Sequence, residues 1–301
     1  MLLESELYER TVQRRISISG IGLFTGQDVD LTFCPAPPGT GIVFRRIDLP
    51  LSLDIPAALQ AVTPSPRCTK LTTEHASVQM VEHVLSAVFA LGIDNVLIEV
   101  AGPEIPSGDG SSLLFVRALE QAGIALQSSR KKVLKVQTPV YWSDGDVHLV
   151  ALPSDEFRIS FTLHYPQSKL IGSQFYSFVV NEAQYKQEIA PCRTFSLYEE
   201  IAPFIAKGLL KGGGLDNALV IKEDRVMNPE GARFSDEMVR HKVLDLIGDL
   251  ALIGSRIVGH IIALRSGHAS HVAFAKQLVL ACSAREESLE VFSNSYVLEN
   301  C

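Results

Sequence analysis

The sequence has few of the features that mark membrane or secreted proteins. No run of 18 apolar residues occurs in its 301 residues, so we expect no membrane-spanning segment. Its five cysteines are scattered, odd in number and never spaced as Cys-x-x-Cys, which indicates neither a disulfide framework nor a thiolate zinc site. The opening Met-Leu-Leu-Glu-Ser-Glu is acidic, and its apolar stretch is too short for a signal peptide. These absences predict a cytoplasmic protein with reduced thiols.

Positive charge is scarce as well. The chain has 27 Lys and Arg against 34 Asp and Glu, which gives a formal net charge of −7. A general nucleic-acid binder would be basic, so we expect no nucleic-acid partner. Hydrophobic residues make up 47% of the chain, and its 301 residues are enough for two ordinary domains with substantial cores.

Short strands and helices alternate in both halves of the chain, on either side of a polar, basic segment at 128–132. In the first half the pattern predicts strands at 11–19, 29–33, 42–46 and 95–100, and helices at 77–91 and from 112 to about 122. In the second half it predicts strands at 133–136, 148–152, 157–163 and 259–264, an insert at 166–173, a helix around 241 and a last helix from about 270. The segment 128–132 is the expected linker between two domains.

A short repeat suggests that the two halves are related. The runs 80–83 and 238–241 share the pattern Met-Val-x-His at the start of a predicted helix. Four residues alone are weak support, but the order of helix, glycine stop and strand recurs as well. We therefore predict an α+β protein of two related β-α-α-β domains, residues 1–127 and 132–301. Each domain would donate one histidine to a site between them.

The predicted helix around 241 carries candidate metal ligands. His241, Asp245 and Asp249 follow one another at intervals of four residues, so they share one helix face. A catalytic zinc site keeps three protein ligands and one open position, and His83, His241 and Asp245 could supply that set. For the pair His241 and Asp245 alone, a hydrogen bond on the helix surface is at least as good an explanation. The adjoining Lys242 and Asp249 favour a site, because burying ionisable groups without partners is costly.

Two further groups could perform acid–base chemistry. Glu82 directly precedes His83, and adjacent helical residues point about 100° apart, so both cannot easily bind one ion. Glu82 could instead act as a general base, although a solvated first-turn glutamate is by itself the better explanation. His268 follows the end of a predicted strand, and Asp249 could hold its imidazole in the cationic form. His271 is expected to lie beside the ligands or on the surface.

Two other segments are ambiguous. Arg193-Thr194-Phe195 places a hydroxyl between a cation and an aromatic ring, which alone means little. The glycines at 212–214 could cradle a ligand, but the Gly-Lys-Ser/Thr ending of a phosphate loop is missing. A helix stop followed by a turn explains these glycines equally well.

Taken together, the motifs resemble one family nearly from end to end, the UDP-3-O-acyl-N-acetylglucosamine deacetylases. These are zinc enzymes of lipid A biosynthesis in Gram-negative bacteria. The segments that carry the resemblance are 20–26 (GIGLFTG), 40–46 (TGIVFRR), 81–87 (VEHVLSA), 92–95 (GIDN), 104–111 (EIPSGDGS), 193–195 (RTF), 215–218 (LDNA), 241–250 (HKVLDLIGDL) and 266–268 (SGH). The segments 153–157 and 189–195 look most like chlamydial members.

The resemblance implies a fold of two β-α-α-β domains and a role for each candidate residue. Zinc would bind His83, His241 and Asp245, and iron(II) could occupy the same ligands in the cell. The remaining implied roles are Glu82 as general base, His268 paired with Asp249 as the charged partner, Thr194 as oxyanion donor, Lys242 at the sugar or phosphate side of the substrate, and Phe195 and Arg265 near the nucleotide sugar. The insert at 166–173 and its flanking strands would form an apolar passage for the acyl chain.

The sequence departs from the family pattern at two positions. Phe24 stands where the family usually has a histidine, which could change nucleotide affinity or substrate preference. His271 stands where the family often has an asparagine. Neither change removes a zinc ligand or Glu82, so we do not infer an inactive relative.

The implied activity is hydrolysis of the N-acetyl group of UDP-3-O-acyl-N-acetylglucosamine by a monomer. A zinc amidohydrolase of the same fold acting on another N-acyl substrate is the alternative that Phe24 keeps open. A metal-binding scaffold without turnover is a third hypothesis. The presence of Glu82, Thr194 and His268 counts against it, because a scaffold needs ligands but no base.

Overall fold

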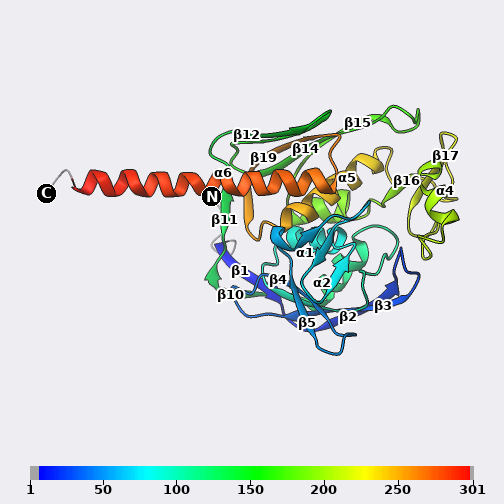
Figure 1. Cartoon of the computed structure of the whole chain (residues 1–301), viewed down its shortest axis with the longest axis horizontal. Helices are drawn as coiled ribbons and strands as arrows, with labels where there is room; N and C mark the ends of the chain where they lie inside the picture. Colours follow the sequence, from blue (N-terminus) through cyan, green and yellow to red (C-terminus); the bar gives the residue numbers. More distant parts are fainter. Residues whose placement is uncertain (1–6, 299–301) are drawn as a thin grey trace.

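A computed structural model describes residues 7–298 of the chain, with side chains described to residue 283. Two sheets enclose a layer of helices (Figure 1). The central helices α1 (Glu82–Ala90) and α5 (Glu237–Ala251) pack against each other. Both are almost entirely buried, and they approach so closely that a Cβ on Gly248 would lie 2.0 Å from the carbonyl oxygen of Glu82. This contact brings the first turn of α1 beside the C-terminal half of α5.

The first sheet is formed by the N-terminal half. Its strands, in spatial order, are β2 (Ile16–Ile21), β3 (Asp28–Pro35), β9 (Val96–Ala101), β4 (Ile42–Arg46) and β5 (Leu53–Pro56). β4 and β9 run parallel, and the other neighbours run antiparallel. Alternating burial along β3 and β9 places Leu31, Phe33, Ile98 and Val100 in the core beneath the helices.

The second sheet repeats this arrangement. Its main path is β12 (Val140–Asp144), β13 (Val147–Leu152), β19 (Arg256–Leu264), β14 (Phe157–Tyr165) and β15 (Gly172–Val179), with β11 (Val133–Lys135) added on β19. Again the two central strands, β14 and β19, run parallel, and the other neighbours on this path are antiparallel. The predicted α+β class is confirmed, and the matching strand orders support an internal duplication.

The junction of the halves differs from the expected linker. β10 (Ile124–Arg130) pairs with β1 (Tyr8–Val12), so residues 128–130 extend a strand. Only residues 131 and 132 separate β10 from β11. The polar side chains of this segment alternate with half-buried positions along an exposed strand. The boundaries 1–127 and 132–301 stay predictions.

Each half carries extra elements before its central helix, between β5 and α1 in the first half and between β15 and α5 in the second. In the first half these are η2 (Leu59–Ala61), β6 (Val62–Thr63), β7 (Lys70–Thr72) and β8 (Ser77–Gln79). In the second half they are α3 (Glu182–Gln184), η3 (Tyr185–Ile189), β16 (Phe195–Leu197), α4 (Tyr198–Ala206), β17 (Leu219–Lys222) and β18 (Arg225–Val226). The large insert of the second half therefore occupies 180–236, and 166–171 is only the turn between β14 and β15.

Several predicted bounds are wrong for local reasons. The helix expected at 77–91 begins only at Glu82, because residues 77–79 pair with β7 and Met80 adopts a positive φ of 65°. The strand expected at 11–19 is divided into β1 and β2. β12 and β15 were absent from the predicted elements, because few of their residues are deeply buried and their hydrophobic pattern is weak.

Two further helices complete the molecule. α2 (Leu113–Ala122) packs on α1, and α6 (His268–Leu298) begins beside α5 and then extends well beyond the sheets (Figure 1). Within residues 7–298, no helix has both the length and the apolar content that crossing a bilayer requires.

Candidate metal centre

His83, Asp245 and His241 meet where α1 approaches α5. Nε2 of His83 lies 3.6 Å from Oδ1 of Asp245, and Nε2 of His241 lies 3.3 Å from the same oxygen. The imidazole rings face each other edge to face at 4.9 Å. All three residues are buried, and one donor atom of each lies within 4.8 Å of the others. The structure thus brings together the three ligands predicted from the sequence.

The donor atoms of this cluster fit a bound cation. Among the described side chains, Oδ1 of Asp245 is the one buried polar atom that has no hydrogen-bond partner. Nδ1 of His241 is 3.0 Å from the carbonyl oxygen of Cys192 and donates its proton there, which leaves the lone pair of Nε2 facing Asp245. Burial opposes the ionisation of Asp245, but Lys242 and His241 outweigh it and hold the pKa of Asp245 well below its usual value. An anionic oxygen between two imidazole nitrogens is a typical set of zinc ligands.

Glu82 stands at the start of α1, beside His83. It is 2% exposed, and its Oε2 accepts a hydrogen bond from the backbone N–H of Thr69 at 3.0 Å. Burial raises the pKa of Glu82, while His268 and His83 oppose this rise. The explanation as a solvated surface glutamate is therefore wrong, because the side chain is buried in the cavity wall next to the ligands.

Asp249 joins two histidines one turn of α5 beyond Asp245. Its Oδ2 accepts hydrogen bonds from Nδ1 of His268 at 2.8 Å and from Nδ1 of His271 at 2.7 Å, and its Oδ1 accepts one from the hydroxyl of Thr69 at 2.5 Å. Burial lowers the pKa of His268, but Asp249, Asp245 and Glu82 outweigh it and raise that pKa to about 9. His268 is therefore cationic at neutral pH.

His271 is fully buried, so the surface position considered for it is wrong. Its Nε2 lies 2.9 Å from the hydroxyl of Ser266, and its Nδ1 is bonded to Asp249. Both ring nitrogens of His271 therefore have a hydrogen-bond partner. Burial lowers the pKa of His271. It lies beside the cluster without facing the cavity.

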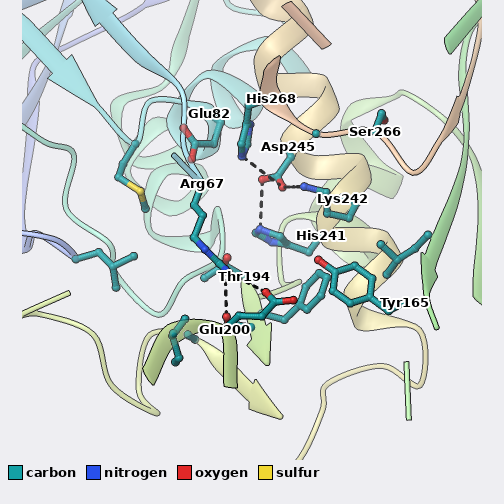
Figure 2. A pocket seen from close by; sticks show the side chains of 18 of the residues that line it. Arg67, Glu82, Tyr165, Thr194, Glu200, His241, Lys242, Asp245, Ser266 and His268 are labelled. Atoms are coloured by element: carbon teal, nitrogen blue, oxygen red, sulfur yellow. Dashed lines mark hydrogen bonds and ion pairs between the residues drawn. The ribbon is translucent and has the colours of Figure 1, made fainter. Parts of the chain in front are cut away.

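The other predicted site residues line the same cavity, and Figure 2 labels two of them, Thr194 and Lys242. Thr194 is fixed by its backbone, which donates to the carbonyl oxygen of Gly110 at 2.8 Å and accepts from the N–H of Leu219 at 2.7 Å. The ring of Phe195 lies edge-on to His241, with 6.5 Å between centroids. Lys242 donates to Oδ2 of Asp245 at 2.7 Å. Each of these contacts holds a cavity residue in place.

Arg265 stands further out. Its guanidinium forms a 3.3 Å ion pair with the exposed Asp146, and its φ is +56°. It lines the cavity and is not part of the ligand cluster.

The cavity has a volume of about 1050 Å³, and apolar as well as polar side chains line it beside the metal ligands. One wall is apolar and comes from the insert of the second half, through Ile201, Ile205, Leu210, Leu215 and Val220. The other is more polar and includes Trp142, Asp144, His164 and Arg265. Phe24 also lines the cavity, on a turn held by the buried carboxylate of Glu104, which accepts from the N–H of Phe24 at 3.1 Å.

Some lining residues had not been predicted. Arg67 and Glu200 on α4 both line the cavity and form an ion pair, with 2.8 Å between Nη2 and Oε2 (Figure 2). Trp142 lies on β12, a strand that was itself missed. The single tryptophan of the chain was the available signal for Trp142, whereas no local pattern relates Arg67 to a residue 133 positions away.

A buried His-His-Asp cluster beside a buried glutamate, at the floor of a deep cavity, defines the class of metal-dependent hydrolases. The family model for UDP-3-O-acyl N-acetylglycosamine deacetylase matches residues 9–280. The UDP-3-O-acyl-N-acetylglucosamine deacetylase of Chlamydia pneumoniae is 46% identical over 277 residues, which cover 92% of this chain and 98% of that protein. Those of Chlamydia caviae and Chlamydia trachomatis serovar D are 45% and 42% identical, and the alignments cover 91% and 93% of this chain and 98% and 97% of those proteins.

The chain belongs to the UDP-3-O-acyl-N-acetylglucosamine deacetylase family, which catalyses the committed step of lipid A biosynthesis. The predicted family, enzyme class and chlamydial similarity are confirmed. The roles of individual residues and the identity of the metal go beyond this assignment.

Proposed function

We propose that this chain is a zinc-dependent deacetylase that hydrolyses the N-acetyl group of UDP-3-O-acyl-N-acetylglucosamine to acetate and the free amine. The observation that carries the proposal is the buried, unpartnered Oδ1 of Asp245 between Nε2 of His83 and Nε2 of His241. The substrate is the one that the names of the relatives give. Zinc held by these ligands would supply Lewis-acid chemistry and would lower the pKa of water toward about 7.

Glu82 would act as the general base. Its carboxylate faces the cavity beside the ligands, and its raised pKa suits a group that takes a proton from an attacking water near neutral pH. The N–H of Thr69 fixes one oxygen of this carboxylate and leaves the other available.

Thr194 and His268 would stabilise the charges that develop on the substrate. The hydroxyl of Thr194 would donate to the oxyanion, a contribution that is typically about 3 kcal/mol for one donor. His268, kept cationic by Asp249, would donate its proton to the leaving amine. Its Nε2 lies 4.0 Å from Oδ2 of Asp245, on the cavity side of the ligands.

The apolar and polar parts of the cavity lining suggest how the substrate would lie. Lys242, Phe195 and Arg265 would contact its sugar and nucleotide part. The acyl chain would follow the apolar wall formed by α4 and the loop before β17, as well as the turn that begins at Pro166. We place the passage mainly in residues 195–226, because most of its apolar side chains come from there.

The test is an acetate-release assay on the full chain, combined with metal analysis. We expect one zinc or iron(II) per chain and turnover of the nucleotide sugar. The position of Phe24 in the cavity favours one alternative, another N-acyl substrate. Simple N-acetyl sugars should therefore be assayed in parallel, and faster turnover of those sugars would replace the proposed substrate. Tightly bound metal without acetate release from any of them would indicate a scaffold instead.

We also propose that the protein acts as a monomer in the cytoplasm. Every candidate ligand comes from a single chain, so the site needs no second subunit. The thiols of Cys34, Cys68 and Cys192 are buried and form no disulfide, which suits a reducing compartment. Light scattering of the purified protein and cell fractionation test these two points.

A further inference from the structure

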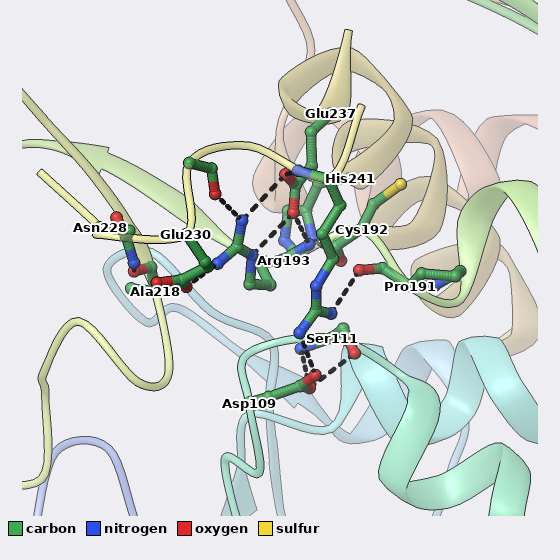
Figure 3. Close-up of polar contacts among 12 residues, drawn as sticks. Asp109, Ser111, Pro191, Cys192, Arg193, Ala218, Asn228, Glu230, Glu237 and His241 are labelled. Carbon is green, nitrogen blue, oxygen red and sulfur yellow. Dashed lines mark hydrogen bonds and ion pairs between the residues drawn. The ribbon is translucent and has the colours of Figure 1, made fainter. Parts of the chain in front are cut away.

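One peptide group, between Cys192 and Arg193, is held on both sides by helix α5. Its carbonyl oxygen accepts the hydrogen bond from Nδ1 of His241 at 3.0 Å. Its N–H donates to Oε1 of Glu237 at 2.9 Å. Glu237 and His241 are four residues apart, so they project from the same face of α5. Figure 3 shows both side chains meeting the segment that contains Cys192 and Arg193.

Glu237 is fully buried and ionised. Burial raises its pKa, but hydrogen bonds from the side chain and backbone of Arg193 and from the backbone of Arg233 outweigh this and lower the pKa below its usual value. Besides the N–H of residue 193, its carboxylate accepts from Nε of Arg193 at 2.9 Å and from the N–H of Arg233 at 2.6 Å. A full negative charge therefore sits against one end of the peptide group.

We propose that Glu237 is a positioning residue for the metal centre, acting on His241 through the Cys192–Arg193 peptide group. The inference rests on the proposed function, in which His241 holds the metal. A carboxylate bonded to the N–H polarises the peptide and strengthens its carbonyl as an acceptor, since hydrogen bonds in a chain reinforce one another. The stronger acceptor fixes the Nδ1–H tautomer and ring orientation of His241 and makes Nε2 a better donor to a metal.

The arrangement extends a familiar device. Metal-binding histidines commonly donate their second ring N–H to a carboxylate or to a backbone carbonyl. Here the carbonyl is the direct partner, and the carboxylate acts one peptide group further away. The proposed role of Glu237 is therefore separate from its ion pair with Arg193.

Arg193 itself is expected to serve stability rather than metal binding. Its guanidinium also bonds to Glu230 and to the carbonyl oxygen of Gly231, so it ties its own segment to the loop that precedes α5. The segment keeps other anchors when this side chain changes, because Thr194 is bonded to Gly110 and Leu219 through its backbone. Any residue at position 193 other than proline still presents its N–H to Glu237.

We therefore expect different effects from substitutions of Glu237 and of its ion-pair partner Arg193. The experiment measures the zinc dissociation constant of the full chain by competition with a chelator, together with the melting temperature. Glu237→Gln should weaken zinc binding roughly tenfold. This is the lower end of the typical effect of substituting a residue that orients a metal ligand. Arg193→Lys should lower the melting temperature but leave the dissociation constant within about twofold.

Asp94 provides a matched control elsewhere in the molecule. Its carboxylate also accepts a backbone N–H, from Arg10 at 2.9 Å, and pairs with Arg256 at 3.1 Å. Asp94→Asn should cost stability without changing zinc affinity. Because Glu237→Gln leaves Arg193 without its main partner, the double variant Glu237→Gln/Arg193→Met, which removes both charges, is measured as well. It should show the same tenfold loss.

Replacing zinc by cobalt(II) adds a spectroscopic test of ligand geometry. We expect altered visible absorption in both Glu237 variants and wild-type spectra in Arg193→Lys and Asp94→Asn. The inference would be overturned if the two Glu237 variants bound zinc with wild-type affinity, or if Arg193→Lys and Asp94→Asn lost as much zinc affinity as they do. Either result would leave the proposed function standing. A wild-type chain that binds no zinc, or a His241→Ala variant that binds it unchanged, would overturn the proposed function and with it this inference.

Discussion

Asp249 on α5 and His268 at the start of α6 are joined by a 2.8 Å hydrogen bond between Oδ2 and Nδ1. Asp249 is fully buried and accepts from two other groups, so its charge is fixed in place. Its pKa falls to about 2, because the attraction of His268 and His271 outweighs burial. The pair therefore stays ionised across the neutral range.

This pair predicts how activity depends on pH. His268 is an acid in the proposed reaction, so kcat/KM should fall as pH rises through about 9, the pKa of His268. The acidic limb should report the ionisation of Glu82, whose pKa is raised by burial. In His268→Gln, the alkaline limb of the kcat/KM profile should disappear, and the rate should fall at least roughly 100-fold. His148→Gln, at a histidine bonded to Tyr141 outside the cavity, is the control and should keep the wild-type profile.

The same pair predicts how stability depends on pH. Folding raises the pKa of His268 from 6.5 to about 9, so its contribution is fully present below pH 6.5 and is lost as pH rises through 9. Folding lowers the pKa of Asp249 from 3.8 to about 2, so its contribution is present above pH 3.8 and is lost as pH falls toward 2. Urea unfolding of wild type and Asp249→Asn across pH tests this, and parallel curves would contradict it.

Glu82→Gln should separate the base from the ligands. The substitution keeps the shape of the side chain but removes its basicity, so turnover should fall roughly 100-fold or more. Zinc content should stay at the wild-type level, because Glu82 is bonded to Thr69 rather than placed among the ligand atoms. Glu9→Gln is a suitable control, since Glu9 is also buried but bonds to Gly39 and Asn95. Near-wild-type turnover of Glu82→Gln with zinc bound would show that another group is the base.

The sequence allowed the ligand cluster to be predicted because its geometry is largely local. Residues four apart on α5 share a face, which relates His241 to Asp245 and Asp245 to Asp249. His83 was added through the repeated Met-Val-x-His pattern and through the family resemblance, and the structure places both histidines at equivalent points of a repeated topology. Which side chains meet was therefore predictable from a helix period and a duplication.

Tertiary contacts explain what the sequence could not provide. Thr69 reaches Asp249 across 180 residues, and Glu237 reaches His241 only through a peptide group of a distant loop. Burial decided the position of His271, which a pattern of polar residues could not reveal. The insert was misplaced because its strands are two to four residues long, too short to show a period.

His83→Ala should abolish tight zinc binding as fully as His241→Ala. Both imidazoles face the same oxygen of Asp245, so removing either one leaves only two of the three proposed ligands. Zinc at 1,000 times its dissociation constant should stabilise the wild-type fold by about 4 kcal/mol, and neither variant should gain this increment. Calorimetry with and without zinc measures it. His260→Ala, at a histidine bonded to Ser160 on the second sheet, should respond like wild type. Tight zinc binding by His83→Ala would remove α1 from the metal site.

Thr194→Val tests the proposed oxyanion donor. Valine keeps the volume of threonine, and the backbone bonds of residue 194 to Gly110 and Leu219 do not involve the hydroxyl. The rate constant kcat should fall about 100-fold, equivalent to roughly 3 kcal/mol, with little change in KM. Thr194→Ser should restore most of the activity. An increase in KM alone would mean that the hydroxyl binds substrate instead of stabilising the transition state.

A substitution in the insert would show where the acyl chain lies. Ala218 directly precedes β17 and lines the cavity, as do Thr194 and the apolar side chains of the insert. In Ala218→Leu the larger side chain should narrow the passage, so kcat/KM should fall at least roughly tenfold for a substrate with a long 3-O-acyl chain. A substrate with a short acyl chain should be hydrolysed almost as by wild type, because the catalytic groups lie outside the passage. Competition between the two substrates in one reaction measures the ratio directly. Equal losses on both would place the acyl chain elsewhere, most simply along the turn at Pro166.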